Sequence, residues 1–505
     1  MNWKRIRSST FVLMAVIIIS KLTGMARDIV LANYYGTTAV SDAYLIAVSV
    51  PSVLFFLIGH SLSTAYLPMY NKINQAHGAT AANRYSNNLI CVTLVFSTVL
   101  VALLLVVPEI VIKVFAAGFD AETTVLAAKF IRISAVSLYF MVVINVWGGY
   151  LQTRENYLIP AAISLPRNAA IILSIVIAAH VSIDSLGVGL LLAYVAEAML
   201  LLPFVLKNGY RVRPCLDFSD AQIRETLYLV APILVSVGVG RINTIVDKSI
   251  ASTLAEGGIS ALSYASVLNN AVQEVAVTGI ITVLFANCAA LVASGEHEKA
   301  KIKLRKTLDA MIFLLIPASV GVMVLAEPII VLLLQRGNFD QQSVVMTTAA
   351  LRCYTVSLFF LAARDALIKM FYAYQDTRIP AKTSMAAVAV NIGLNFLFSR
   401  FWGLSGLALA TSAAMILQSS ALWILFHKKH QKMDNRQLIS EFLQVLGISI
   451  LMGVLVHFTY RWIPESAGTL LALCASVGVG IIVYVAANLI LNKRYTFGVI
   501  RSIFS

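Results

Sequence analysis

The sequence predicts an all-α integral membrane protein of about 14 transmembrane helices. Its 505 residues are 59% hydrophobic and only 12% charged, about half the charged fraction of a soluble domain. Long apolar stretches follow one another with short polar connections, and an internal repeat with an offset of 220 residues relates two parts of the chain. This composition excludes a disordered chain, a secreted disulfide scaffold and a soluble enzyme.

Fourteen stretches meet the requirement of a span, which is about 20 mostly apolar residues. They lie near residues 9–31, 40–66, 86–107, 123–150, 157–179, 186–206, 225–251, 259–293, 306–326, 343–373, 379–399, 404–426, 440–460 and 468–491. The eighth is long enough to be broken or strongly tilted. The first is expected to be a helix and not a cleavable signal, because its apolar run continues past Lys21 to Leu31.

Basic residues in the connections orient these helices, because cytoplasmic loops are enriched in Lys and Arg. With the N-terminus inside, the segments expected outside contain only Lys113, Arg336, Arg400 and Arg461. A missed helix would invert every later loop, so this asymmetry favours fourteen spans with the N and C termini both cytoplasmic. The net charge of +14 is therefore a topology signal and not a nucleic-acid-binding patch.

The repeat aligns residues 108–161 with residues 328–381 without a gap. The matched pairs include Pro108 and Pro328, Phe119 and Phe339, Asp120 and Asp340, Arg132 and Arg352, and Pro160 and Pro380. We predict an N-terminal six-helix repeat at 1–220, a C-terminal six-helix repeat at 221–435, and two additional helices with a cytoplasmic tail at 436–505. Six is even, so the repeats are parallel, as in transporters that rock one half against the other.

Ionisable residues inside spans are costly unless they face a cavity or a partner. They are densest in the first helix of each repeat, which carries Lys21, Arg27 and Asp28 in one case and Arg241, Asp247 and Lys248 in the other. Repeat symmetry brings these cations together, and the planar fork of Arg suits phosphate. We expect a cationic cavity for an anionic substrate, lined by Lys21, Arg27, Asp42, Arg241 and Lys248.

Two alternatives accompany that cavity. Arg27 is adjacent to Asp28, and Asp247 to Lys248, so the charges could pair internally. Sequence neighbours face different directions on a helix, however, so internal pairing is not expected to satisfy all of them. His60, on the second helix, is placed near the cavity, with a packed neutral side chain as its alternative.

A second group of residues is rich in oxygen. Asn391 and Asn395 are four residues apart and share a helix face, and Asp247 and Thr411 complete the set. Hard oxygen ligands of this kind suit a small cation such as Na⁺. The alternative, which the residues alone favour, is hydrogen bonding between helices.

The sequence contains no catalytic motif. There is no phosphate-binding glycine loop, no His pair at metal spacing and no nucleophile elbow. The five cysteines are scattered and fit small apolar residues in helices. We therefore expect no enzyme activity and no resident metal, with Na⁺ as the only candidate cofactor.

Several stretches resemble the MurJ/MviN family of bacterial lipid II flippases. They are SKLTGMARDIVLANYYGTTAVSDAYLIAVSVPSVLF at 20–55, RINTIVDKSIAS at 241–252, QDTRIPAKTSMAAVAVNIGLNFLF at 375–398 and GLSGLALATS at 403–412. The resemblance covers nearly the whole chain. It implies movement of an undecaprenyl-pyrophosphate-linked glycan, with lipid II for peptidoglycan synthesis first, from the inner to the outer leaflet of the bacterial cytoplasmic membrane by alternating access.

Some of the candidate site positions match the family residue and others differ from it. Arg27 and Asp42 match family positions, whereas Lys21 stands where an Arg is usual. The resemblance implies a sodium site at Asp247, Asn391, Asn395 and Thr411, with Asn395 in place of an acid.

The sequence departs from the family at two cavity arginines. Phe55, Phe56 and His60 stand where an Arg pair and a Glu are usual, and Val267 replaces another Arg. Arg241 is the candidate replacement cation. A flippase for another lipid-linked polysaccharide unit, a cation-coupled drug exporter of the same superfamily and a membrane-embedded enzyme remain alternatives. The resemblance also implies a monomer with membrane lipid and cell-wall synthesis proteins as partners.

Overall fold

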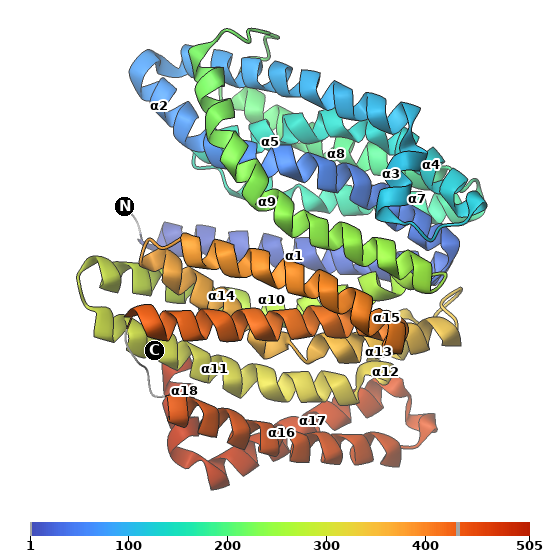
Figure 1. Ribbon diagram of the computed structural model, residues 1–505, viewed down its shortest axis with the longest axis vertical. Coiled ribbons are helices and arrows are strands. Elements are labelled where there is room, and N and C mark those ends of the chain that lie inside the picture. Colours follow the sequence, from blue (N-terminus) through green and yellow to red (C-terminus); the bar gives the residue numbers. More distant parts are fainter. Residues whose placement is uncertain (1–2, 431–434, 505) are drawn as a thin grey trace. The chain divides into compact units, whose positions relative to one another are not determined.

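The computed structural model describes residues 3–430 and 435–504, and over these residues the chain is helical without a strand (Figure 1). The all-α prediction is therefore confirmed. The chain divides into two compact units, Met1–Ser260 with Arg336–Phe339, and Ala261–Gln335 with Asp340–Ser505.

The first unit is organised around one long helix. Its elements are α1 (Trp3–Tyr35), α2 (Ala39–Val106), α3 (Pro108–Phe115), α4 (Ala121–Ala135), α5 (Ser137–Thr153), α6 (Leu158–Ala162), α7 (Ser164–His180), α8 (Ser185–Lys207) and α9 (Ala221–Leu254). Helix α2 packs against α4, α5 and α9, while α7 packs against both α1 and α8. The tyrosines Tyr66, Tyr70, Tyr85, Tyr150 and Tyr210 form much of one buried cluster. Helix α9, the first span of the second repeat, is thus part of this unit.

The second unit contains the rest of the chain and begins at Ala261 inside α10, whose first three residues belong to the first unit. Its elements are α10 (Gly258–Ala293), α11 (His297–Val324), α12 (Ala326–Leu334), α13 (Gln341–Thr355), α14 (Leu358–Ala373), α15 (Arg378–His430), α16 (Asn435–Trp462), a 3₁₀ turn (Glu465–Ala467), α17 (Thr469–Leu491) and α18 (Lys493–Phe504). Helix α11 packs against α14 and α16. The hydroxyls of Tyr484 and Tyr495 donate to the carbonyls of Phe313 and Asp309 at 2.8 and 2.9 Å. These bonds attach α17 and α18 to α11.

The helices of the described residues include eight that are long and apolar enough to cross a membrane, or ten if each of two bent pairs is one span. The bent pairs are α4 with α5, at 43°, and α13 with α14, at 45°. Large apolar side chains such as Leu103, Ile177 and Ile482 are exposed on these helices. A multi-pass membrane protein is therefore the observed class.

Two pairs of expected spans are joined more closely than the sequence indicates. The stretches 40–66 and 86–107 both lie in α2, which is interrupted only by the non-helical backbone of Gly78, at φ 77°. The stretches 379–399 and 404–426 both lie in α15, with a break at Gly403, at φ 55°. A single glycine that adopts positive φ is enough to kink a helix without a loop, and hydropathy does not reveal it.

Local geometry recurs at the offset of the sequence repeat. Asp120 and Asp340 cap α4 and α13, each accepting at 2.8 Å from a backbone N–H, that of Thr123 and that of Ser343. Both helices have 15 residues. After the next helix in each repeat, Glu155 and Gln375 share a φ of 57°. The matched sequence positions therefore adopt matched backbone conformations.

Candidate substrate-binding site

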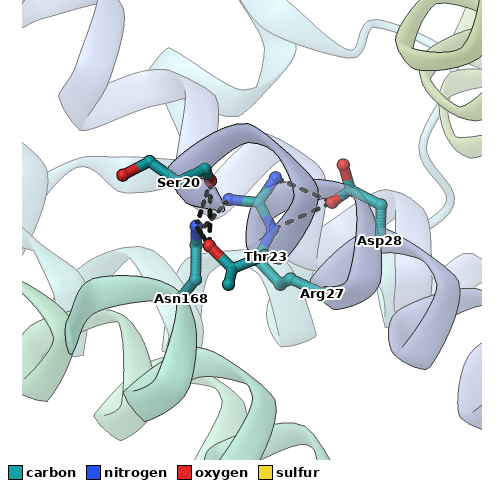
Figure 2. A network of polar contacts seen from close by, with 5 residues as sticks. All are labelled: Ser20, Thr23, Arg27, Asp28 and Asn168. Atoms are coloured by element: carbon teal, nitrogen blue, oxygen red, sulfur yellow. Dashed lines mark hydrogen bonds and ion pairs between the residues drawn. The ribbon is translucent and has the colours of Figure 1, made fainter. Parts of the chain in front are cut away.

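Arg27 and Asp28 lie on α1 and form an ion pair (Figure 2). Asp28 Oδ1 accepts from Arg27 Nε at 2.9 Å and from Arg27 Nη2 at 2.7 Å. The internal pairing considered as an alternative is therefore present. The Arg27 side chain nevertheless remains 27% exposed.

Asn168 on α7 connects this pair to the rest of the unit (Figure 2). Its Nδ2 donates to Thr23 Oγ1 at 3.0 Å and to the Ser20 carbonyl at 3.3 Å. Its Oδ1 accepts from Arg27 Nη1 at 3.5 Å. The sequence reasoning missed Asn168 because it searched for charge. The signal in the sequence was an amide beside Arg167 in a span that is mostly apolar. In the structure, Arg167 pairs with the buried Glu197 at 3.2 Å.

Lys21 is exposed on the same helix, α1. It lies six residues before Arg27, so the two side chains are well separated along the helix surface. The side chain of His60 lies outside the described residues.

Asp42, near the start of α2, is buried with 2% of its surface exposed. Its Oδ1 accepts from the backbone N–H of Ser260 at 2.7 Å, and its Oδ2 from that of Ile259 at 3.4 Å. Ser41 Oγ and Ser260 Oγ lie 3.2 Å apart beside this contact. Asp42 thus caps the first turn of α10 and is occupied by backbone donors.

Lys248 on α9 reaches across to α2. Its Nζ donates to Ser49 Oγ and, at 3.4 Å, to the Leu45 carbonyl. Farther along α9, Ser252 Oγ accepts from the backbone N–H of Gly118 at 3.0 Å. The C-terminal part of α9 is therefore held by side-chain contacts to α2 and to the α3–α4 connection.

Arg241, the candidate replacement cation, is half-buried on α9. Its guanidinium carbon lies 3.4 Å from the centroid of the Phe56 ring on α2, a cation–π contact. Phe56 is one of the two phenylalanines that stand at the expected arginine pair, and the other, Phe55, is 7% exposed. The ring of Phe56 on α2 thus supports an arginine from another helix, α9.

The oxygen-rich residues fall in both units. Within the second unit, Asn395 Nδ2 donates to Asn391 Oδ1 at 3.1 Å, and Asn391 Nδ2 donates to Thr411 Oγ1 at 3.5 Å. In the first unit, Asp247 Oδ2 accepts from Asn243 Nδ2 at 3.1 Å. The two amides and the hydroxyl are neutral and bond to one another, which suits hydrogen bonding within α15 as they stand.

Comparisons with known proteins agree on one family. A family model described as lipid II flippase MurJ matches residues 31–477. A probable lipid II flippase MurJ from Vibrio cholerae is 26% identical over 520 residues, covering 97% of each chain. One from Thermotoga maritima is 28% identical over 404 residues, covering 79% of this chain and 80% of its own.

Solved structures give a similar result. A lipid II flippase MurJ in an inward closed conformation superposes with a TM-score of 0.82 at 25% identity, covering 96% of this chain and 99% of its own. An inward-facing multidrug resistance MATE family transporter of the MOP superfamily shares the fold with a TM-score of 0.69 at 14% identity, covering 85% of this chain and 99% of its own. With 447 of 505 residues inside the family model, this chain belongs to the lipid II flippase MurJ family.

Proposed function

We propose that this protein moves lipid II from the inner to the outer leaflet of the bacterial cytoplasmic membrane by alternating access. The observation that carries the proposal is the match to the lipid II flippase MurJ family model over residues 31–477. The relatives named as lipid II flippases span the same length as this chain. The protein is a transporter and not an enzyme.

The chemical task fits the cations of the first unit. A pyrophosphate and its sugars must cross about 30 Å of hydrocarbon, where an unpaired charge is costly. Arg27 offers a partly exposed guanidinium, and Lys21 an exposed ammonium on the same helix. Arginine binds two phosphate oxygens at once, so we assign Arg27 the main contact with the pyrophosphate. Arg241, supported by Phe56, takes the place of a missing cavity arginine.

We infer fourteen spans with both termini in the cytoplasm. Helices α1, α9 and α10 add to the ten candidates, and α15 contributes two spans around Gly403. The six-helix repeats at 1–220 and 221–435 and the two additional helices at 436–505 follow from the offset of 220 residues. In this topology the loops that contain Gly36, Gly118, Gly257 and Gly337 lie outside.

At the same end, the helices and these loops are joined by a set of contacts that we name the outer contacts. The backbone N–H of Asn338 donates to the Asn33 carbonyl at 2.9 Å. The other three contacts are Asp42 with Ser260, Lys248 with Ser49, and Gly118 with Ser252. All four fall within the first unit. We infer that they hold the outer ends of α1, α2 and α9 together while substrate enters from the cytoplasmic side.

The energy source of transport and the oligomeric state are proposed from the family alone. A cation at Asp247, or the membrane potential, would reset the empty carrier, since one charge moved through the field is worth about 2.3 kcal/mol per 100 mV. The group Asn391, Asn395 and Thr411 holds Na⁺ only if the ion displaces its present hydrogen bonds. We expect a monomer that works beside cell-wall synthesis proteins.

Complementation of a strain depleted of its lipid II flippase tests the proposal. The wild-type chain should restore growth, and Arg27→Ala should fail while it still inserts into the membrane. Ser174→Ala on α7 is a suitable control, because among the described residues the Ser174 hydroxyl bonds within its own helix, to the Ile171 carbonyl. A wild-type chain that inserts but does not restore growth would point to another lipid-linked glycan.

A further inference from the structure

Asn168 is a buried amide whose bonds all lead to one other helix. It is 2% exposed, and its side chain contacts Ser20, Thr23 and Arg27 of α1 (Figure 2). Most buried side-chain polar atoms in proteins have a hydrogen-bond partner. Here the partners include the cation that the proposed function assigns to the pyrophosphate.

The direction of the amide follows from its partners. Thr23 Oγ1 donates its own proton to the Ser20 carbonyl at 2.8 Å, so toward Asn168 it can only accept. The Ser20 carbonyl is also an acceptor, which places Nδ2 of Asn168 against both oxygens at 3.0 and 3.3 Å. The oxygen of the amide therefore faces Arg27 Nη1.

The guanidinium of Arg27 is thereby held on two sides. It has five N–H groups. Asp28 accepts two of them, from Nε and Nη2, and Asn168 accepts one, from Nη1. Over the part of the chain that the structure describes, two N–H groups remain, which matches the number that a phosphate group accepts from an arginine fork.

The amide also sets the charge of the cluster. Asp28 already supplies one negative charge against the single positive charge of Arg27. A second carboxylate at position 168 would make the cluster net negative and repel a pyrophosphate. A neutral oxygen holds the guanidinium without this cost.

We propose that Asn168 is the positioning residue for Arg27: it fixes the guanidinium so that its two remaining N–H groups meet the pyrophosphate, and it keeps the cluster free of a second negative charge. The proposal rests on the proposed function and adds a specific residue to it. A purely structural pin between α7 and α1 is the competing role; the bond from Ser20 Oγ to the Ala161 carbonyl at 3.3 Å joins α1 to α6 and does not supply it.

Asn168→Asp separates the two roles. A carboxylate still accepts from Arg27, but its other oxygen faces Thr23 Oγ1 and the Ser20 carbonyl, which offer it no proton, so the variant should have a lower Tm than the wild type and is assayed well below that temperature. Binding of purified lipid II in detergent by the folded variant should weaken at least about tenfold, because the added negative charge repels the pyrophosphate. Ser174→Ala should bind as the wild type does.

A double-mutant cycle with Arg27 completes the test. In an Arg27→Ala background, Asn168→Ala should cause no further loss of lipid II binding, because the group that Asn168 positions is gone. Additive losses, or binding by Asn168→Asp within twofold of the wild type, would overturn the proposal.

The geometry gives a readout that does not depend on the substrate. In an experimental structure of the Asn168→Ala variant, the Arg27 guanidinium should leave its place beside α7, and an unchanged guanidinium would also overturn the proposal. If the wild-type chain binds no lipid II while the guanidinium does move, the proposed function fails and the positioning role stands.

Discussion

The carboxylate of Asp42 on α2 accepts the backbone N–H of Ser260 on α10 at 2.7 Å, across a separation of 218 residues in the sequence. This acidic side chain in an apolar span is therefore a helix cap supplied by another helix. The bond joins the start of α2 to the start of α10, the second helix of the other predicted repeat. In the proposed topology it makes Asp42 one of the outer contacts.

Removal of this cap should favour opening of the outer end. Asp42→Ala loses an N-cap, worth about 1 kcal/mol, which corresponds to roughly a fivefold increase in the open population. The measure is labelling of Ser41→Cys by an impermeant thiol reagent, in a background where the five free cysteines are replaced by serine. Asp42→Asn keeps one acceptor oxygen and should label at an intermediate rate. Equal labelling rates with Asp42, Asp42→Ala and Asp42→Asn would show that Asp42 does not help to close the outer end.

A substitution at Gly257 tests the close approach of two backbone segments at the same end of the molecule. A Cβ there would lie 2.1 Å from the Thr37 carbonyl oxygen, at a φ of +73°. Gly209 has a φ of +87° with no atom within 4 Å of its Cβ position, so it is the matched control. Both alanine variants should lose about 1 kcal/mol to the left-handed backbone, and only Gly257→Ala should add a clash. Thermal unfolding in detergent should therefore show a clearly lower Tm for Gly257→Ala, and equal values would contradict the close approach.

Phe56 should be necessary for the contribution of Arg241. A cation–π contact of a partly desolvated arginine is worth about 1–2 kcal/mol, so Phe56→Leu should weaken lipid II binding roughly five- to thirtyfold. Phe56→Trp restores an aromatic face and should restore binding. The same loss for Phe56→Leu in an Arg241→Ala background would show that the ring acts through something other than Arg241.

Asp376, in the connection before α15, gives the second unit a pH dependence. Burial alone would raise the pKa of this carboxyl, but hydrogen bonds from Lys429 at 2.7 Å and from the backbone N–H groups of Ile379 and Arg378 outweigh it and hold the pKa below its ordinary value. A lowered pKa means that its contribution to stability is complete above the ordinary value of about 3.9 and is lost as pH falls through the folded-state pKa.

This sign fixes the expected profile. Asp376→Asn should lower Tm relative to the wild type at pH 7, and the difference should shrink below about pH 4 as the wild-type carboxyl is protonated. Lys429→Met should reproduce most of the loss at pH 7. A difference in Tm that stays constant from pH 7 to pH 3 would show that the charge of Asp376 has no part in it.

The helical membrane class, the repeat offset of 220 residues and the placement of Arg27 on the first helix could be predicted, because hydropathy, repetition and charge are visible in the sequence itself. The bond between Asp42 and Ser260 could not be predicted from the sequence, since a cap between two helices depends on tertiary packing. Asn168 escaped notice because an uncharged amide has no penalty that stands out in a hydrophobic profile. The kinks at Gly78 and Gly403 could not be predicted, because positive φ is a property of the backbone and not of composition.

Direct measurement of lipid II translocation tests the central claim. Cells depleted of their own flippase and carrying this chain receive an impermeant enzyme that cleaves lipid II in the outer leaflet. We predict that the wild-type chain restores cleavage and that Arg27→Ala, inserted at the same level, does not. Lipid II that stays protected in the presence of correctly inserted wild-type protein would contradict the account.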